Sequence, residues 1–234
     1  MKKKIILLSI VLLTLAACAP ATGSYAANVL SVTGQSQVSI APDVAYVSIG
    51  VRTESTDVSQ AVSSNASQAE RVMSALRDSG VSQDDMQTTN FSVYSYDDYD
   101  FEGNSIGLTF NVENTVYVTV RNLAGMGELL DSAVGSGANN IWGIQFDVED
   151  KSAAVAEARS LALADAQEQA QALASEAEVS LGAITSLSYT NGGYSAYPLY
   201  GVGGGGAGIA DSSTTIVPGQ ISVNVSVYLS YEIR

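Results

Sequence analysis

The stretch Val29–Thr53, VLSVTGQSQVSIAPDVAYVSIGVRT, decides the fold class. Apolar and polar residues alternate along Val29–Ile40 and again along Val44–Thr53, the period-two pattern of strands with one buried face. Ala41-Pro42-Asp43 interrupts the alternation and indicates a turn. We therefore expect the globular part of the chain to begin with two consecutive strands.

Three later segments have helical periodicity. Asp57–Asp78 carries its apolar residues on one side and is followed by Gly80, a typical helix stop. Residues 123–134 form a shorter helical segment. The longest segment, Ser152–Glu178, is rich in alanine. Each is expected to cover a sheet with its apolar side.

Five further segments alternate like strands: Asn90–Tyr96, Leu108–Val120, Ile141–Val148, Ala183–Tyr189 and Ile221–Ile233. The resulting order, ββαββαβαββ, predicts an α+β domain over residues 28–234. In this domain, three helices pack on a mixed, mainly antiparallel sheet. Residues 190–219 are rich in Gly, Ser and Tyr and predict a loop, either a plain connector or a flap that contacts a partner.

The N-terminus has the pattern of an export signal. Residues 1–17 combine the basic start MKKK with an apolar run too short to span a bilayer. The motif LAAC, ending at Cys18, resembles the cleavage site of a bacterial lipoprotein; an ordinary secretory signal is the alternative. We therefore expect a signal peptide, lipidation of Cys18 and a flexible tether over residues 18–27.

The residue after the cysteine bears on the location of the anchor. Ala19 stands where many lipoproteins retained in the inner membrane carry an aspartate. This favours the outer membrane, facing the periplasm, in a Gram-negative source, and otherwise the outer face of the cytoplasmic membrane. The lipid makes the membrane the first expected partner.

Charge and missing residue types exclude several functions. The chain has 10 Lys+Arg against 24 Asp+Glu, which disfavours nucleic acid as a partner. It has no His, which excludes a Ser-His-Asp relay and histidine zinc sites, and its one Cys is the predicted lipidation site. After the leader, Lys151 is the only lysine on which a Ser-Lys dyad or Schiff base could depend. We therefore expect no enzyme activity.

No cofactor is expected either. Gly201-x-Gly203-x-x-Gly206 matches the dinucleotide-binding pattern, but that site needs a strand before it and a helix N-terminus after it. Here another strand follows. We interpret the match as incidental.

The stretch YDDYDFEGN, residues 96–104, gathers the candidate cation-binding residues Asp97, Asp98, Asp100 and Glu102. Aligned to an EF-hand loop, three of these acids and Gly103 fit, but position 12 is Thr109 instead of the bidentate glutamate. The flanking segments are also strand-like. Three interpretations remain open: the polar tip of a hairpin, a weak cation site, or a pair of catalytic carboxylates.

An alanine falls at every fourth position of the third helix. Such a row forms a low ridge that allows close approach of another element. This element is either the domain's own sheet or, in the alternative, a second subunit. The candidate contact residues are Ala154, Ala158, Ala162, Ala166, Ala170 and Ala174.

Together these segments carry a resemblance. The chain resembles the SIMPL-domain family in Gly34, Pro42-Asp43-x-Ala45, Asn65, NTVYVTV at residues 114–120 and GANNIWGIQF at residues 137–146; Leu181-Gly182 and Pro218-Gly219 agree as well. Bacterial members include periplasmic immunogenic and oxidative-stress-defence proteins. The resemblance implies an envelope-facing α+β domain that assembles into oligomers in some relatives. It implies no catalytic residues.

We thus expect a lipid-anchored envelope protein that acts as a non-catalytic binding or self-assembly module, with a role in envelope or oxidative stress tolerance. Its partners would be copies of itself or other envelope proteins. The alternatives are a calcium-binding protein that uses the acidic stretch, and a hydrolase that uses only carboxylates.

Overall fold

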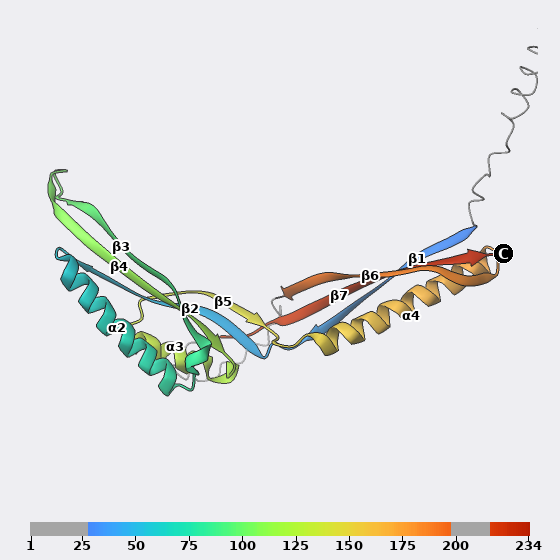
Figure 1. The fold of residues 1–234 in the computed structure, drawn as a ribbon, viewed down its shortest axis with the longest axis horizontal. Coiled ribbons are helices and arrows are strands. Elements are labelled where there is room, and N and C mark those ends of the chain that lie inside the picture. The colour runs from blue at the N-terminus through green and yellow to red at the C-terminus, as the bar shows by residue number, and fades with distance from the viewer. Residues whose placement is uncertain (1–27, 198–215) are drawn as a thin grey trace, which may run out of the picture.

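The computed structural model describes residues 28–197 and 216–234, which form two lobes (Figure 1). The strands and α-helices are β1 (Val29–Ile40), β2 (Val44–Ser55), α2 (Val58–Asp78), β3 (Met86–Tyr99), β4 (Ser105–Val120), α3 (Met126–Gly135), β5 (Asn140–Asp147), α4 (Ser152–Glu176), β6 (Leu181–Tyr197) and β7 (Gln220–Ile233). The larger lobe has the strand order β3-β4-β2-β5 with helices α2 and α3; the smaller lobe has the order β1-β7-β6 with helix α4. All neighbouring strands are antiparallel.

The predicted α+β class and the order ββαββαβαββ are confirmed. The strands, however, form two sheets. β1 pairs along its whole length with the last strand, β7, whereas β2 pairs with β4 and β5 in the other sheet. Pro42, in the link between β1 and β2, has no N–H with which to continue a ladder, so the chain leaves one sheet there and enters the other.

The core of the larger lobe lies between its sheet and helices α2 and α3. Opposed residues in neighbouring strands point to the same face, so Val47 of β2 and Val118 of β4 both turn toward the helices. Leu76 of α2 and Met126 of α3 are fully buried against them. Burial of each such side chain stabilises the lobe by roughly 1.5–3 kcal/mol.

A buried polar residue joins α2 to two strands. The Nδ2 atom of Asn65 donates to the carbonyl oxygens of Val51 in β2 and Val112 in β4, each at 3.0 Å. Asn65 is fully buried, so water could not replace its amide as the donor to these two carbonyls. The side chain therefore fixes how α2 lies on the sheet.

The alanine row of α4 packs against its own sheet. All six alanines are at most 7% exposed, and all but Ala174 share a core with Val32 of β1 and with valines of β7. The prediction of a subunit contact through Ala154, Ala158, Ala162, Ala166, Ala170 and Ala174 is therefore wrong for this arrangement, because the chain itself covers them. The other interpretation, close packing within the domain, is the observed one.

Gly34 of β1 is the reason that α4 can lie so close. A Cβ atom at this position would overlap the carbonyl oxygen of Ala162 and the amide nitrogen of Ala166, both backbone atoms of α4. The side chains of β1 add polar contacts: Ser36 Oγ donates to the carbonyl oxygen of Ala158. Together these contacts hold α4 over β1 and β7.

The boundary of the predicted loop at 190–219 is wrong at its start. Residues 190–197 continue β6 and pair with β7, and Tyr194 lies opposite Val223. Gly193 has φ +91°, and the pairing register shifts between Asn191 and Tyr194, so the glycine serves a bulge in a strand. Residues 198–215 lie outside the described part.

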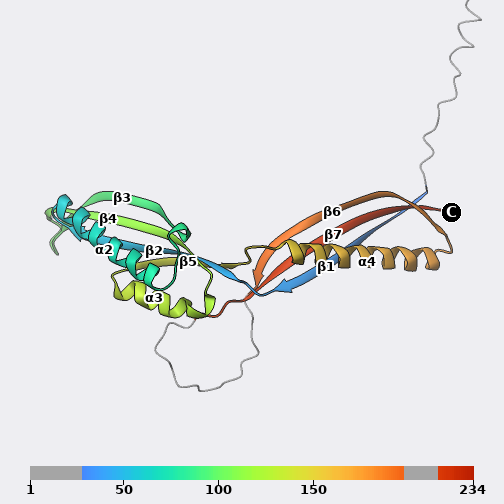
Figure 2. The same cartoon turned by 60° about the horizontal axis from the view of Figure 1, so that its bottom comes forward.

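The lobes lie end to end in an elongated molecule (Figures 1 and 2). β1 starts and β7 ends at the outer tip of the smaller lobe, so the described chain begins and ends there. The β3–β4 hairpin projects from the opposite end. Among the described residues, no helix combines the length and apolarity needed to cross a bilayer.

Candidate functional site

The predicted acidic cluster lies at the tip of the β3–β4 hairpin. β2 ends at Ser55, opposite Phe110, so from Tyr96 and Thr109 outward the hairpin has only two strands. We call residues 96–109 the arm. The hairpin-tip interpretation of YDDYDFEGN is therefore the observed one.

Asp100 holds the turn of the arm. Its Oδ1 accepts from the backbone N–H groups of Glu102 and Asn104 at 2.9 Å, and its Oδ2 from Asn104 Nδ2 at 3.1 Å. The hydrogen bonds from Asn104, and then those from Glu102 and Gly103, hold the pKa of Asp100 below its ordinary value. Both carboxylate oxygens are thus engaged within the loop.

The four carboxylates do not converge. Asp97 and Asp98 are consecutive strand residues, so their side chains point to opposite faces. Within residues 28–197 and 216–234, no group of three or more acidic, Cys or His side chains is placed to hold a metal ion. Asp97 and Asp98 therefore do not form a facing pair of the kind that glycosidases use. Cation binding by Asp97, Asp98, Asp100 and Glu102 stays a prediction.

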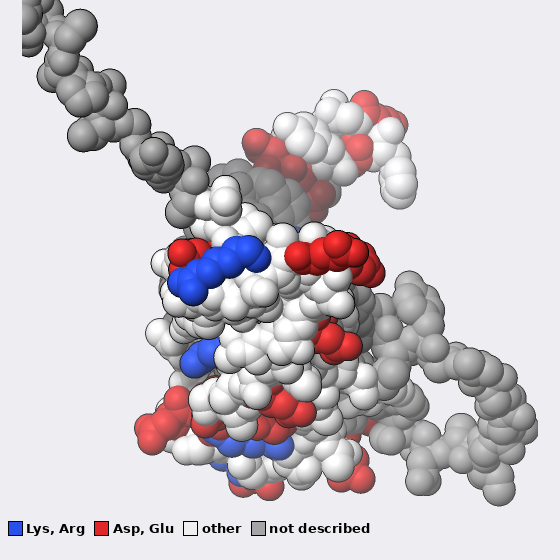
Figure 3. Space-filling view, turned by 90° about the vertical axis from the view of Figure 1, so that its right-hand side faces the viewer, with Lys and Arg blue, Asp and Glu red and all other residues white. Residues whose placement is uncertain are grey.

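The arm also exposes a series of large apolar side chains. Phe101 at the tip is fully exposed, and Leu108 is 49% exposed. A two-stranded hairpin is only marginally stable in water without further packing. The arm carries four carboxylates and no Lys or Arg, and acidic side chains gather on the projection at the back of Figure 3. Its other exposed apolar residues are Tyr96, Tyr99 and Ile106.

A second exposed apolar surface lies in the smaller lobe, on β6. Because α4 packs over β1 and β7, it leaves the helix-side face of β6 uncovered. Leu187, opposite the buried Leu229, is 57% exposed. The β6 strip, as we call it, consists of Ile184, Leu187, Tyr189 and Tyr194, each at least 45% exposed.

Two cations flank the β6 strip: Arg159 of α4 and Lys151 at the N-terminal boundary of α4. The guanidinium of Arg159 lies 4.6 Å from the Tyr189 ring centroid, and Lys151 Nζ lies 5.0 Å from that of Tyr194. Lys151 also pairs with Asp147 Oδ1 at 2.8 Å. Arg159 forms no salt bridge with any carboxylate in the described ranges. The strip therefore borders an uncompensated positive charge.

The edge of β6 is also unprotected. β6 is the last strand in the order β1-β7-β6 and contains no charged residue and no proline along Leu181–Tyr197. Natural edge strands usually carry such residues to prevent pairing with another chain. Together with the strip, this edge is suited to protein contact.

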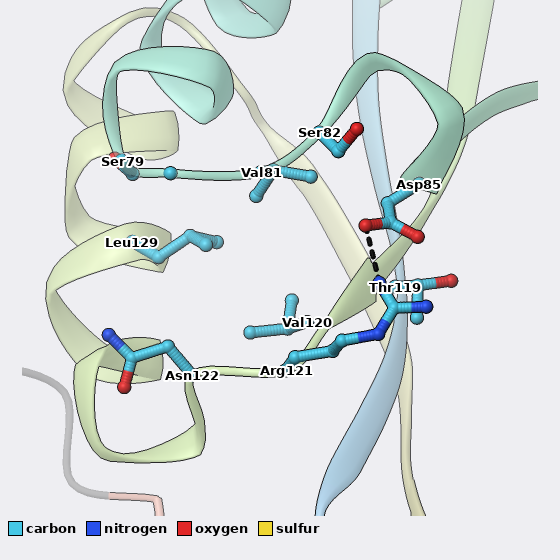
Figure 4. A pocket seen from close by; sticks show the side chains of 10 residues that line it. Ser79, Val81, Ser82, Asp85, Thr119, Val120, Arg121, Asn122 and Leu129 are labelled. Atoms are coloured by element: carbon cyan, nitrogen blue, oxygen red, sulfur yellow. Dashed lines mark hydrogen bonds and ion pairs between the residues drawn. The ribbon is translucent and has the colours of Figure 1, made fainter. Parts of the chain in front are cut away.

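A small pocket in the larger lobe offers an alternative site (Figure 4). Its most polar wall is Arg121, which bonds Asp85 and pairs with Glu149 at 2.9 Å. Hydrogen bonding by Arg121 holds the pKa of Glu149 below its ordinary value. With two carboxylates on one guanidinium, the arginine is already satisfied. Apolar Val81, Val120 and Leu129 form part of the remaining wall.

Lys151 is not placed as a catalytic base. Its ammonium group bonds Asp147 and the carbonyl oxygen of Val148, and its side chain is only 17% exposed. A Ser-Lys dyad has no support in these contacts, which instead link β5 to the start of α4.

Cys18 and the glycines 201, 203 and 206 lie outside the described residues.

Of the β6 strip, only Tyr194 was missed because residues 190–197 read as a loop; Ile184, Leu187 and Tyr189 lie in the predicted strand Ala183–Tyr189. The alternation at Leu187 and Tyr189 is visible in the sequence. That these side chains stay uncovered depends on the position of α4, which alternation alone does not specify.

Comparison with known proteins supports the resemblance seen in the sequence. A family model described as "SIMPL: Protein of unknown function (DUF541)" matches residues 30–231. The chain is similar to the 26 kDa periplasmic immunogenic protein of Brucella melitensis biotype 1, with 28% identity over 215 residues, 88% of this chain and 84% of that protein. It is also similar to the uncharacterized protein YggE of Escherichia coli K12, with 26% identity over 167 residues, 71% of this chain and 67% of YggE.

Proposed function

Because the chain belongs to the SIMPL family, we propose that it is a lipid-anchored protein of the bacterial envelope that works by contact with other protein chains and not by catalysis. The observation that carries this proposal is the β6 strip: four large side chains, uncovered on an uncharged edge strand, beside Arg159. Exposed apolar groups of this kind mark protein contact sites.

The location rests on two supports. The Brucella relative is named as a periplasmic protein. The LAAC motif before Cys18 and the residue Ala19 favour an acyl anchor in the outer membrane if the source is Gram-negative. Labelling cells with a radioactive fatty acid tests the anchor: the protein should be labelled, and Cys18→Ala should lose the label. Label on the Cys18→Ala variant would contradict it.

The preferred contact is with further copies of this chain. A contact through the β6 strip predicts that the protein associates in detergent and that Leu187→Glu weakens the association, because a carboxylate would be buried in an apolar contact. Ser188→Glu is the matched control, since Ser188 is the next residue and points to the other face of the sheet, opposite Tyr228. Sedimentation velocity distinguishes the two variants.

The proposal fails if Leu187→Glu sediments like the control Ser188→Glu and the unaltered protein.

A role in stress tolerance is the physiological part of the proposal. A strain that lacks the protein should survive oxidant or envelope stress less well, and complementation by the Leu187→Glu variant should not restore survival. Survival equal to that of the parent strain would contradict this part.

A further inference from the structure

We propose that the acidic arm of one copy docks on the β6 strip of another copy. The inference rests on the proposed self-association and names its two surfaces. They lie in different lobes, near opposite ends of an elongated molecule (Figure 1). The arm of one copy therefore contacts the β6 strip of a neighbouring copy and not its own.

Charge favours this pairing. The arm carries Asp97, Asp98, Asp100 and Glu102 with no cation, whereas the strip is bordered by Arg159, which no described carboxylate neutralises. Two arms together would repel each other. Contact of the arm with the strip places opposite charges together, which favours both encounter and register.

The apolar surfaces match in kind. The arm exposes Phe101 and Leu108, and the strip exposes Leu187 and Tyr189. Aromatic side chains with uncovered apolar neighbours are the usual centres of protein contacts. Docking would also supply the packing that a two-stranded hairpin lacks in water.

Backbone pairing is available as well. β3 is the edge strand of its sheet, and β6 is an edge strand of the other. An extended strand can add to an exposed sheet edge through main-chain hydrogen bonds, with side-chain contacts for specificity.

The contact is heterologous, because the two copies use different surfaces. Unless two copies place their arms on each other's strips, which closes a dimer with two such contacts, each copy has a strip still open to the next arm and the contact propagates to a ring or a filament. A contact between two β6 strips would instead stop at a dimer.

Charge reversal tests the inference on the acylated protein in detergent. Arg159→Glu alters the strip, and Asp97→Lys with Glu102→Lys alters the arm while leaving Asp100 and the turn intact; Asp97 lies opposite Leu108 and so shares its face. Each variant should associate at least about tenfold more weakly. The controls are Arg71→Glu, and Glu70→Lys with Asp78→Lys, which make the same charge changes on α2 and should associate normally.

Mixing the strip and arm variants should restore association as far as a one-to-one complex, because the unaltered arm of one meets the unaltered strip of the other. The restored complexes should contain both variants in equal amounts, which also shows that both are folded. Sedimentation equilibrium with differently labelled chains measures this ratio. Equal numbers of the two variants in the complex would support the inference.

Two results would overturn it. If the arm variant associates like the unaltered protein, the strip binds something other than the arm. If both variants are monomers but the mixture does not associate, the contact is not between arm and strip. In either case the proposed function stands; a monomeric unaltered protein would instead remove both.

Discussion

The guanidinium of Arg159 lies over the ring of Tyr189, 4.6 Å from its centroid, and so joins the exposed side of α4 to the uncovered face of β6. The ring holds the cation without cancelling its charge, whereas an aspartate or glutamate would. This leaves a positive charge at the border of an apolar surface, in a chain with a net charge of −14.

The first prediction concerns this pair. Tyr189→Phe keeps a ring face for Arg159 and should leave association unchanged. Tyr189→Ser removes the ring both as the support of Arg159 and as an apolar residue of the strip, and should weaken association at least about two- to fivefold, the range of an exposed cation–π contact alone. Sedimentation equilibrium measures the change. Equal association by the two variants would show that the ring does not position Arg159.

The second prediction concerns the packing of α4. Gly34→Ala should destabilise the smaller lobe by about 1–3 kcal/mol, since its methyl group would overlap the backbone of α4 at Ala162 and Ala166. The control is Gly135→Ala, at the end of α3, where an added Cβ meets no neighbour within 4 Å. Urea unfolding followed by circular dichroism compares them. Equal midpoints would contradict the close approach.

The third prediction concerns α2. Asn65→Ala should lower the free energy of unfolding by about 2–4 kcal/mol, because the buried carbonyls of Val51 and Val112 lose their donor. Ser64→Ala, at the neighbouring exposed position, should change it by less than about 0.5 kcal/mol. The same urea titration serves for both. A loss for Asn65→Ala as small as that of the control would contradict the role of the amide.

The fourth prediction concerns pH. The N–H of Gln35, at 2.7 Å, and then Gln169 hold the pKa of Asp165 below its ordinary value of 3.8. A lowered pKa in the folded state means that the carboxylate stabilises the fold fully above the ordinary value. The contribution is then lost as the pH falls through the lower, folded value.

Asp165→Asn supplies the comparison. The unaltered protein should exceed this variant in stability by a constant amount at neutral pH, and the difference should shrink below pH 3.8. Urea unfolding at a series of pH values measures it. A difference that stays constant down to strongly acidic pH would exclude Asp165 as the titrating group.

The sequence was informative wherever one element determines its own pattern. Alternation found the strands, and fourfold spacing found the Ala ridge of α4 and its close packing. The division into two sheets was not predictable in this way, because alternation marks a buried face but does not state which strand lies beside it. β1 and β7 are far apart in sequence and yet pair throughout.

The candidate surfaces show the same limit. The acids of the arm were visible in sequence, but their separation on two faces of a ribbon was not. At Gly192-Gly193 the glycines indicated a loop, whereas the strand accommodates them in a bulge. The exposure of Leu187 depends on where α4 lies, which Gly34 of a distant strand decides.

We propose that this chain acts by docking to other protein chains, first of all to its own copies. Crosslinking of the protein in the envelope of its source organism, with the mass of each product measured, is the decisive experiment. We expect products at multiples of the mass of a single chain, which Leu187→Glu removes and Ser188→Glu keeps. An unaltered protein that yields only monomer, in the envelope and in detergent, would contradict it.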